Sequence, residues 1–304
     1  MPAKSSASLL GPGLMVFTMG LYVANDALVK LLGVVMPLGE IISLRGFLVI
    51  GALALAVLAL PGHGARAFRW LAHPRVLIRA GWDTAVTFLY LFALLNMPIA
   101  NVLAVMNLSP LAILPVAARR LGERVHLAQW LAVLAGLAGA LIVVRPGPEG
   151  FNPWAISAFL AMLGVVGRDF ATRDIPPQAP SLSIALSNVL MVQAGGLLLW
   201  AMQSGQSIWP PDAAQWLMLT GCALFLGAAY VLMVVVVRIT PMSKTAPWRY
   251  SIVLWGVLAG WLVFGEWPDA LTLLGMGIIV AAALYATFWE LRLAFRADAG
   301  NNRR

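Results

Sequence analysis

The residues of this sequence that could do chemistry are ionisable side chains inside strongly apolar stretches. A charge at the centre of a lipid bilayer costs about 2.5 to 3.5 kcal/mol on insertion scales, so it needs a partner, a wet cavity or a function. One group lies in the first two stretches, and its charges sum to zero: Asp26, Lys30, Glu40 and Arg45. A second group has two acids and four bases: Asp83, Arg168, Asp169, Arg173, Lys244 and Arg249.

Aromatic and amide side chains accompany these charges. A ring can stack on a ligand ring or hold an ammonium group by cation-π contact, and the excess of bases in the second group could bind a carboxylate. Trp82 and Asp83 are neighbours, so one could hold a ring and the other an amine. The candidates for ligand binding are Asn25, Trp82, Asp83, Tyr90, Asn101, Trp248 and Tyr250. The alternative for each is packing against lipid, the core or a neighbouring helix.

The composition indicates which class of protein must position these residues. Of 304 residues, 61% are hydrophobic and 11% are charged, with a mean hydropathy of +0.88, whereas soluble domains carry roughly 25% charged residues. One cysteine, Cys222, and three histidines, His63, His73 and His126, suggest neither a disulfide nor a metal site. The sequence therefore predicts an integral membrane protein without a cofactor. Its net charge of +8 fits membrane topology better than nucleic-acid binding.

Ten apolar stretches are long enough to cross a bilayer, which takes roughly 20 residues. They cover residues 9–32, 36–60, 76–95, 98–118, 127–144, 153–172, 181–202, 213–237, 241–264 and 270–288. With the N-terminus inside, lysine and arginine collect in the cytoplasmic loops, and Arg145 is the exception among the outer loops. This bias sets orientation. We therefore expect an all-α protein of the bacterial inner membrane with both termini in the cytoplasm.

An internal repeat relates the two halves of the chain. A shift of 143 positions superimposes these pairs: Asp26 and Asp169, Lys30 and Arg173, Pro37 and Pro180, Pro98 and Pro241, Gly122 and Gly265, Glu123 and Glu266. The sequence thus predicts two five-helix copies, residues 1–148 and 149–304. Because five is odd, the second copy must enter the membrane from the opposite side, which is the inverted-repeat design of secondary carriers.

Two acid and base pairs have the spacing that places both side chains on one helix face. Asp26 precedes Lys30 by four residues, and Asp169 precedes Arg173 by four, which permits ion pairs. We expect the first group near the outer membrane face and the second near the inner face, as opposed gates of a cavity. The alternative is that each pair only neutralises itself near the headgroups. Protons could couple through Asp26, Asp83 or Asp169, and passive transport or exchange stays open.

Two segments carry a resemblance to a known family. Residues 98–144 and 241–287 each read as a helix, a loop and a helix, with Leu121-Gly122-Glu123-Arg124 and Phe264-Gly265-Glu266-Trp267 at corresponding places. They resemble the EamA-type repeats of the drug/metabolite transporter superfamily, in its ten-helix branch. The overall pattern is similar to the YddG aromatic amino acid exporters. Trp267 and Pro268 depart from the first copy at the end of this loop.

The resemblance implies an alternating-access carrier that exports aromatic and other neutral amino acids and related small metabolites. The alternative in the same superfamily is a carrier of drugs or nucleotide-linked metabolites. An intramembrane enzyme is disfavoured because no span contains a His or Cys nucleophile pair, and a channel because no repeated polar filter is present. We expect a monomer or homodimer whose partners are lipid and a small-molecule substrate.

Overall fold

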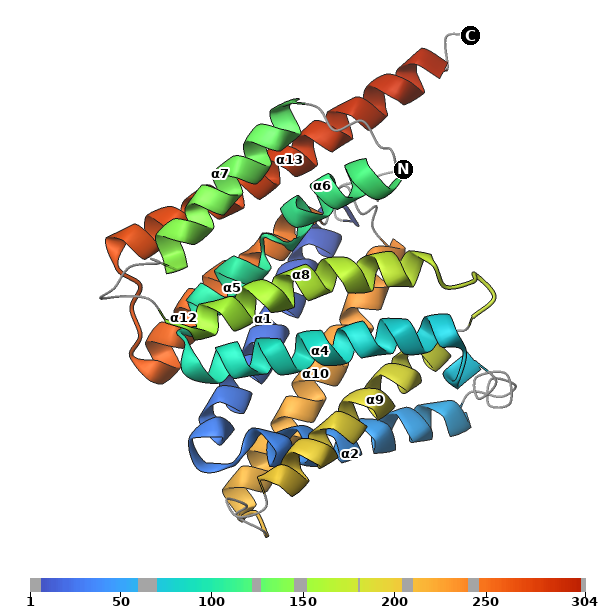
Figure 1. The fold of residues 1–304 in the computed structure, drawn as a ribbon, viewed down its shortest axis with the longest axis vertical. Helices are drawn as coiled ribbons and strands as arrows, with labels where there is room; N and C mark the ends of the chain where they lie inside the picture. Colours follow the sequence, from blue (N-terminus) through green and yellow to red (C-terminus); the bar gives the residue numbers. More distant parts are fainter. Residues whose placement is uncertain are drawn as a thin grey trace. The chain divides into compact units, whose positions relative to one another are not determined.

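The computed structural model describes residues 7–59, 70–121, 127–144, 152–179, 181–203, 210–239 and 246–301, which form helices and short connections (Figure 1). The α-helices are α1 (Ala7–Val35), α2 (Leu38–Ala59), α4 (Pro74–Asn96), α5 (Ile99–Met106), α6 (Ser109–Leu121), α7 (Leu127–Val144), α8 (Trp154–Arg173), α9 (Ser181–Met202), α10 (Ala213–Ile239), α12 (Ser251–Phe264) and α13 (Ala270–Asn301). A 3-10 helix, η2 (Ala246–Tyr250), directly precedes α12. The fold class is all-α, as predicted.

The predicted span 98–118 is divided into two helices, α5 and α6. Asn107 ends α5, where its backbone N–H bonds to the Leu103 carbonyl at 3.0 Å and its side-chain amide donates to the same oxygen at 2.8 Å. Pro110 has no N–H to continue the ladder of hydrogen bonds, and the ladder resumes with Ala112 bonding to Leu108. Counted as one span, α5 and α6 occupy the predicted place.

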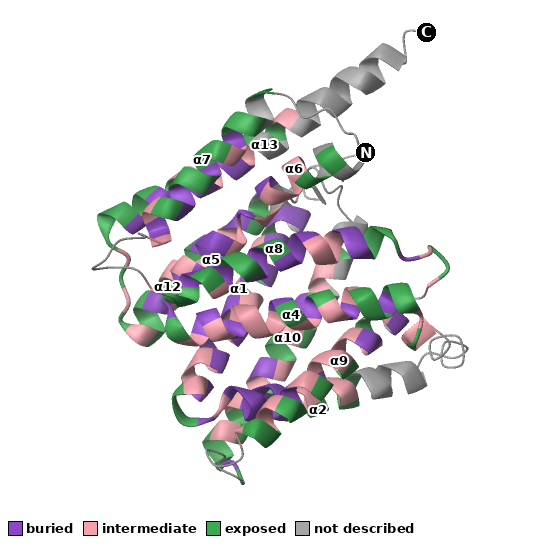
Figure 2. Ribbon diagram, in the orientation of Figure 1, coloured by how far each residue is buried: buried purple, intermediate pink, exposed green. Residues whose placement is uncertain are grey.

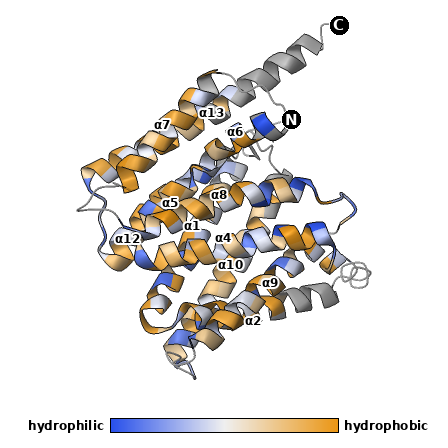
Figure 3. Cartoon of the chain, in the orientation of Figure 1, coloured by the Kyte–Doolittle hydropathy of each residue, from blue (hydrophilic) through white to orange (hydrophobic). Residues whose placement is uncertain are grey.

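Five described helices are long and apolar enough to cross a membrane by length and composition alone. They cover Gly11–Val35, Pro74–Asn96, Trp154–Arg173, Ser183–Met202 and Ala213–Tyr230. The other apolar helices found are shorter, such as Trp130–Val144 and Ala270–Tyr285. Their exposed surface is also apolar. Along α7, Figures 2 and 3 show exposed hydrophobic residues: Leu127, Leu131, Leu134, Leu137 and Leu141. Such a stripe suits contact with lipid.

Helix boundaries recur at the spacing of the sequence repeat. The first and last residues of α2, Leu38 and Ala59, lie 143 positions before Ser181 and Met202, which bound α9. Asn96, the last residue of α4, lies 143 positions before Ile239, the last residue of α10. Leu127, the first residue of α7, lies 143 positions before Ala270, the first residue of α13. The division at residue 148 and the inverted orientation of the copies stay predictions.

The contacts divide the chain into two compact units, and each takes segments from both predicted copies. The first unit comprises Met1–Val23, Met97–Ala155 and Ala228–Arg304, and the second comprises Ala24–Asn96 and Ile156–Gly227. Helices α1 and α10 therefore each contribute to both units.

In the second unit, α2 packs closely on α9, and α4 packs on α8 and α9. A Cβ on Gly39 of α2 would overlap the backbone of Trp200 on α9. The backbones of the two helices therefore approach each other there without side chains between them. The ring of Trp82 on α4 covers Gly167 of α8, and its atoms lie 3.0 Å from the position that a Cβ on Gly167 would take. Small residues permit such close helix contacts in membranes.

In the first unit, α7 packs on α13 and α5 on α12. Gly139 and Gly275 face each other. A Cβ on Gly139 would lie 2.8 Å from the Gly275 carbonyl oxygen, and a Cβ on Gly275 would lie 2.7 Å from the Gly139 carbonyl oxygen. Two glycines facing each other let these helices approach closely, as small residues do at helix contacts in membranes. The indole of Trp255 on α12 donates to the Val16 carbonyl of α1 at 2.9 Å.

Gly265 ends α12 in the left-handed conformation, with φ of 67°. Its N–H bonds to the Trp261 carbonyl at 3.1 Å, and the Glu266 N–H bonds to Gly260 at 2.8 Å, which closes the helix end. We expect Gly265→Ala to lower the free energy of unfolding by about 1 kcal/mol, because a Cβ is strained in this conformation. Thermal unfolding in detergent checks this. Gly277→Ala is the control, because nothing lies within 4 Å of its Cβ position; an equal loss there would contradict the prediction.

Candidate functional site

A buried polar cluster surrounds Asp26 in the second unit. Asp26 is 7% exposed. Its Oδ1 accepts a hydrogen bond from the Asn25 amide at 3.0 Å, and its Oδ2 accepts one from the Tyr90 hydroxyl of α4 at 2.5 Å. Arg45 of α2 donates to the Asn25 side-chain oxygen at 3.5 Å. Asn25 therefore stands between the guanidinium and the carboxylate.

The fourth helix at this cluster is α10. The buried thiol of Cys222 lies 3.9 Å from the Asn25 carbonyl oxygen. The cluster thus joins residues of α1, α2, α4 and α10. Two predicted binding candidates, Asn25 and Tyr90, lie here beside the predicted coupling residue Asp26. The hydrogen bonds found for the Asp26 carboxylate come from the neutral groups of Asn25 and Tyr90; its pairing with Lys30, which the helical spacing permits, stays a prediction.

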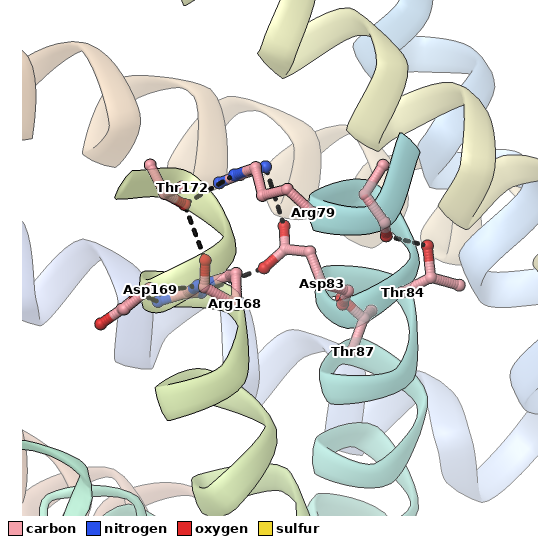
Figure 4. A network of polar contacts seen from close by, with 8 residues as sticks. Arg79, Asp83, Thr84, Thr87, Arg168, Asp169 and Thr172 are labelled. Atoms are coloured by element: carbon pink, nitrogen blue, oxygen red, sulfur yellow. Dashed lines mark hydrogen bonds and ion pairs between the residues drawn. The ribbon is translucent and has the colours of Figure 1, made fainter. Parts of the chain in front are cut away.

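A second cluster joins α4 to α8 (Figure 4). Arg168 Nη1 lies 3.0 Å from Asp83 Oδ1, and Arg168 Nη2 lies 3.0 Å from Asp169 Oδ1. Arg79 adds a longer ion pair, 3.8 Å from Asp83 Oδ2, and donates to the Thr172 hydroxyl at 3.3 Å. Asp83 therefore sits between two arginines.

The α4 and α8 cluster is less buried than the first. The side chains of Asp83, Arg168 and Asp169 are 11%, 29% and 43% exposed. The predicted pair of Asp169 with Arg173 is replaced, because Asp169 bonds to its neighbour Arg168, while the Arg173 guanidinium lies 5.7 Å from the Phe170 ring centre. Both helices of this cluster belong to one compact unit, so these ion pairs hold that unit together.

Helix α4 contributes to both clusters. Asp83 and Tyr90 are seven residues apart, which is two helical turns or about 10.5 Å on one face. Asp83 contacts α8 and Tyr90 contacts α1. Trp82, 44% exposed, packs over Gly167, next to Arg168. The structure thus brings Trp82, Asp83, Arg168 and Asp169 together, as the sequence suggested for the first two.

The remaining candidates belong to the first unit or lie outside the described residues. Trp248 and Arg249 in η2 are exposed, and Tyr250 is buried. Lys244 lies outside the described residues. Asn101 lines a cavity of about 380 Å³ at the ends of α5, α7 and α12, with Asn152, Glu266, Trp267 and Thr272 among the other lining residues.

Sequence reasoning missed several residues of these clusters. Arg79 precedes Asp83 by four residues, the spacing of a helical ion pair, so that signal was available. Cys222 carried no signal beyond its apolar surroundings. The side-chain amide of Gln193 on α9 is buried against Gly46 of α2 with neither polar atom hydrogen-bonded, and only the packing of the two helices places it there.

Comparisons with known proteins find a family match over part of the chain. The sequence model of the EamA-like transporter family matches residues 152–288. A riboflavin transporter of Vibrio cholerae is 29% identical over 233 residues, covering 71% of this chain and 74% of that protein. The pseudopaline exporter CntI of Pseudomonas aeruginosa is 25% identical, covering 85% and 89%. An S-adenosylmethionine uptake transporter of Rickettsia bellii is 24% identical, covering 60% and 61%.

One solved crystal structure shares the fold. It aligns with a TM-score of 0.55 at 21% identity, covering 96% of this chain and 99% of that one. The named relatives transport riboflavin, pseudopaline and S-adenosylmethionine, so the matches support the superfamily and not the aromatic amino acid exporters in particular. The chain is thus similar to transporters of small metabolites, and its residues 152–288 match the EamA-like transporter family.

Proposed function

We propose that this chain is an alternating-access carrier for a small polar metabolite that contains an aromatic ring, with riboflavin as the first substrate to test. The observation that carries the proposal is the cluster of Trp82, Asp83 and Arg168, which offers a partly exposed ring beside a carboxylate and a guanidinium. Riboflavin combines a fused aromatic ring with polar groups, and a relative is named for it. The two five-helix copies supply the symmetry that alternating access needs.

Aromatic and other neutral amino acids are the second candidate substrates. The same cluster favours them, because Trp82 could hold the side-chain ring while Asp83 and Arg168 meet the amine and the carboxylate. Counterflow in proteoliposomes separates the candidates. Vesicles loaded with unlabelled riboflavin should transiently accumulate labelled riboflavin, and the same test is run with phenylalanine and S-adenosylmethionine. A carrier without counterflow of any of these would contradict the proposed substrate class.

A substitution at Trp82 tests the ring contact. We expect Trp82→Ala to raise the half-saturating riboflavin concentration about fivefold, which corresponds to about 1 kcal/mol for one aromatic contact. Trp82→Phe should retain most of the affinity because a ring remains. The control is Trp216→Ala, which removes an exposed indole from the first turn of α10. Equal effects of the two alanine substitutions on half-saturation would contradict a contact between Trp82 and the substrate.

A further inference from the structure

Asp26 is bonded differently from Asp83 and Asp169, the two acids of the α4 and α8 cluster. Asp83 and Asp169 each bond directly to arginine. In the described part of the chain, the hydrogen bonds found for the two Asp26 carboxylate oxygens come from the neutral groups of Asn25 and Tyr90. The cation of α2, Arg45, reaches Asn25 and not the carboxylate.

The surroundings of Asp26 make a permanent negative charge costly. Its neighbours on α1, Val23, Ala27 and Val29, are buried and apolar. A buried ionised carboxylate without a directly bonded cation is strongly disfavoured and tends to take up a proton. The titratable or charged groups around it are Tyr90 of α4, Arg45 of α2, Cys222 of α10 and, one turn along α1, Lys30. Of these groups, Tyr90 is the one whose hydrogen bond to the carboxylate is found in the described part of the chain.

Protonation would change the contact between α1 and α4. The ionised carboxylate only accepts hydrogen bonds, whereas the protonated acid also carries one donor. A proton on Oδ2 would face the Tyr90 hydroxyl, whose own hydrogen would then have to turn away. The link between Asp26 and Tyr90 therefore differs between the two protonation states.

The position of Asp26 along the chain connects this change to transport. Helix α1 passes from the first compact unit to the second between Val23 and Ala24, three residues before Asp26. Helix α10 passes between Gly227 and Ala228, and Cys222 on it contacts Asn25. Any movement of one unit against the other must be taken up by the segments that connect them. The residues of the Asp26 cluster on α1 and α10 lie close in sequence to two of these segments.

We propose that Asp26 is the proton-binding site that couples substrate movement to the proton gradient, with Tyr90 and Asn25 as positioning residues. This rests on the proposed carrier function. In each cycle an O–H bond forms on the Asp26 carboxylate from water on one side of the membrane, and the same proton leaves to water on the other side. One coupled proton can support about tenfold accumulation per pH unit, since tenfold corresponds to about 1.4 kcal/mol.

The first experiment needs no substrate. Infrared spectra of the purified protein at acid and alkaline pH should contain the carbonyl band of a buried protonated carboxyl group that disappears at high pH. Asp26→Asn should lose this band, and Asp83→Asn, the matched removal of an ion-paired acid, should keep it. If Asp26→Asn does not fold, Tyr90→Phe decides, because loss of the hydrogen bond must shift the band. A band absent from the parent protein, or unchanged in Asp26→Asn or in Tyr90→Phe, overturns the proposal.

The second experiment separates coupling from carrier function. Riboflavin counterflow at equal pH tests the carrier, and accumulation driven by a gradient of one pH unit tests the coupling. The parent protein should accumulate riboflavin up to about tenfold, and the ratio of accumulation to counterflow should fall to the gradient-free value in Asp26→Asn. Counterflow without gradient-driven accumulation in the parent overturns coupling and leaves the carrier intact. Absence of riboflavin counterflow refutes riboflavin as substrate, while the infrared result still decides whether Asp26 binds a proton.

Discussion

Replacing Arg168 with glutamine is expected to lower the free energy of unfolding by about 2 kcal/mol, less than for a fully buried ion pair, because the Arg168 side chain is 29% exposed. Arg168 bonds to Asp83 and Asp169 at 3.0 Å each, and the Asp83 side chain is only 11% exposed. Glutamine would leave Asp83 with the more distant Arg79, 3.8 Å away. The cost arises mainly from a poorly compensated charge. Thermal unfolding of the purified protein in detergent measures it.

Two further variants test that explanation. The double variant Arg168→Gln with Asp83→Asn should recover most of the lost stability, because it removes the charge that the single variant leaves uncompensated. Arg173→Gln should cost less than about 1 kcal/mol, because Arg173 is exposed and its contact in the described residues is with the Phe170 ring, and such contacts are weak at exposed sites. A double variant as unstable as Arg168→Gln alone would show that the ion pair is not the cause.

The helices could be predicted from the sequence because their signal is local. A run of about 20 apolar residues is long enough to span a bilayer, and the predicted stretches 127–144 and 181–202 agree with α7 and α9 at both ends. The break between α5 and α6 also has a local cause in Pro110, which the sequence shows. The two compact units could not be predicted, because they combine helices that lie far apart in the sequence.

The charged pairs were predictable only in part. The helical spacing of Asp26 with Lys30 and of Asp169 with Arg173 indicated contacts along one helix. The structure joins Asp26 to Tyr90, 64 positions away, and Arg168 to Asp83, 85 positions away. Helix packing decides which side chains meet across an interface, and a single sequence contains little information on it. The types of residue were therefore foreseen better than their partners.

The packing of α2 on α9 leads to a second large expected effect. Gly39→Ala should lower the free energy of unfolding by about 3 kcal/mol, the upper range for overpacking. A Cβ at Gly39 would overlap the backbone nitrogen and Cα of Trp200, and a backbone cannot turn aside as a side chain can. The Gly39 N–H also donates to the Gln203 side chain at 3.0 Å, so the start of α2 is held against the end of α9. Thermal unfolding in detergent is again the measurement.

Gly51 provides the matched control on the same helix, because nothing lies within 4 Å of its Cβ position. Gly51→Ala should leave the stability unchanged or raise it by up to about 1 kcal/mol, since alanine is the better helix former. Both variants add one methyl group to α2, so the difference between them isolates the contact with Trp200. Gly46→Ala distinguishes backbone from side-chain obstruction, because its Cβ would meet only the Gln193 side chain, which can rotate. We expect the loss for Gly46→Ala to lie between the other two; equal stability of all three variants would contradict a close backbone contact between α2 and α9.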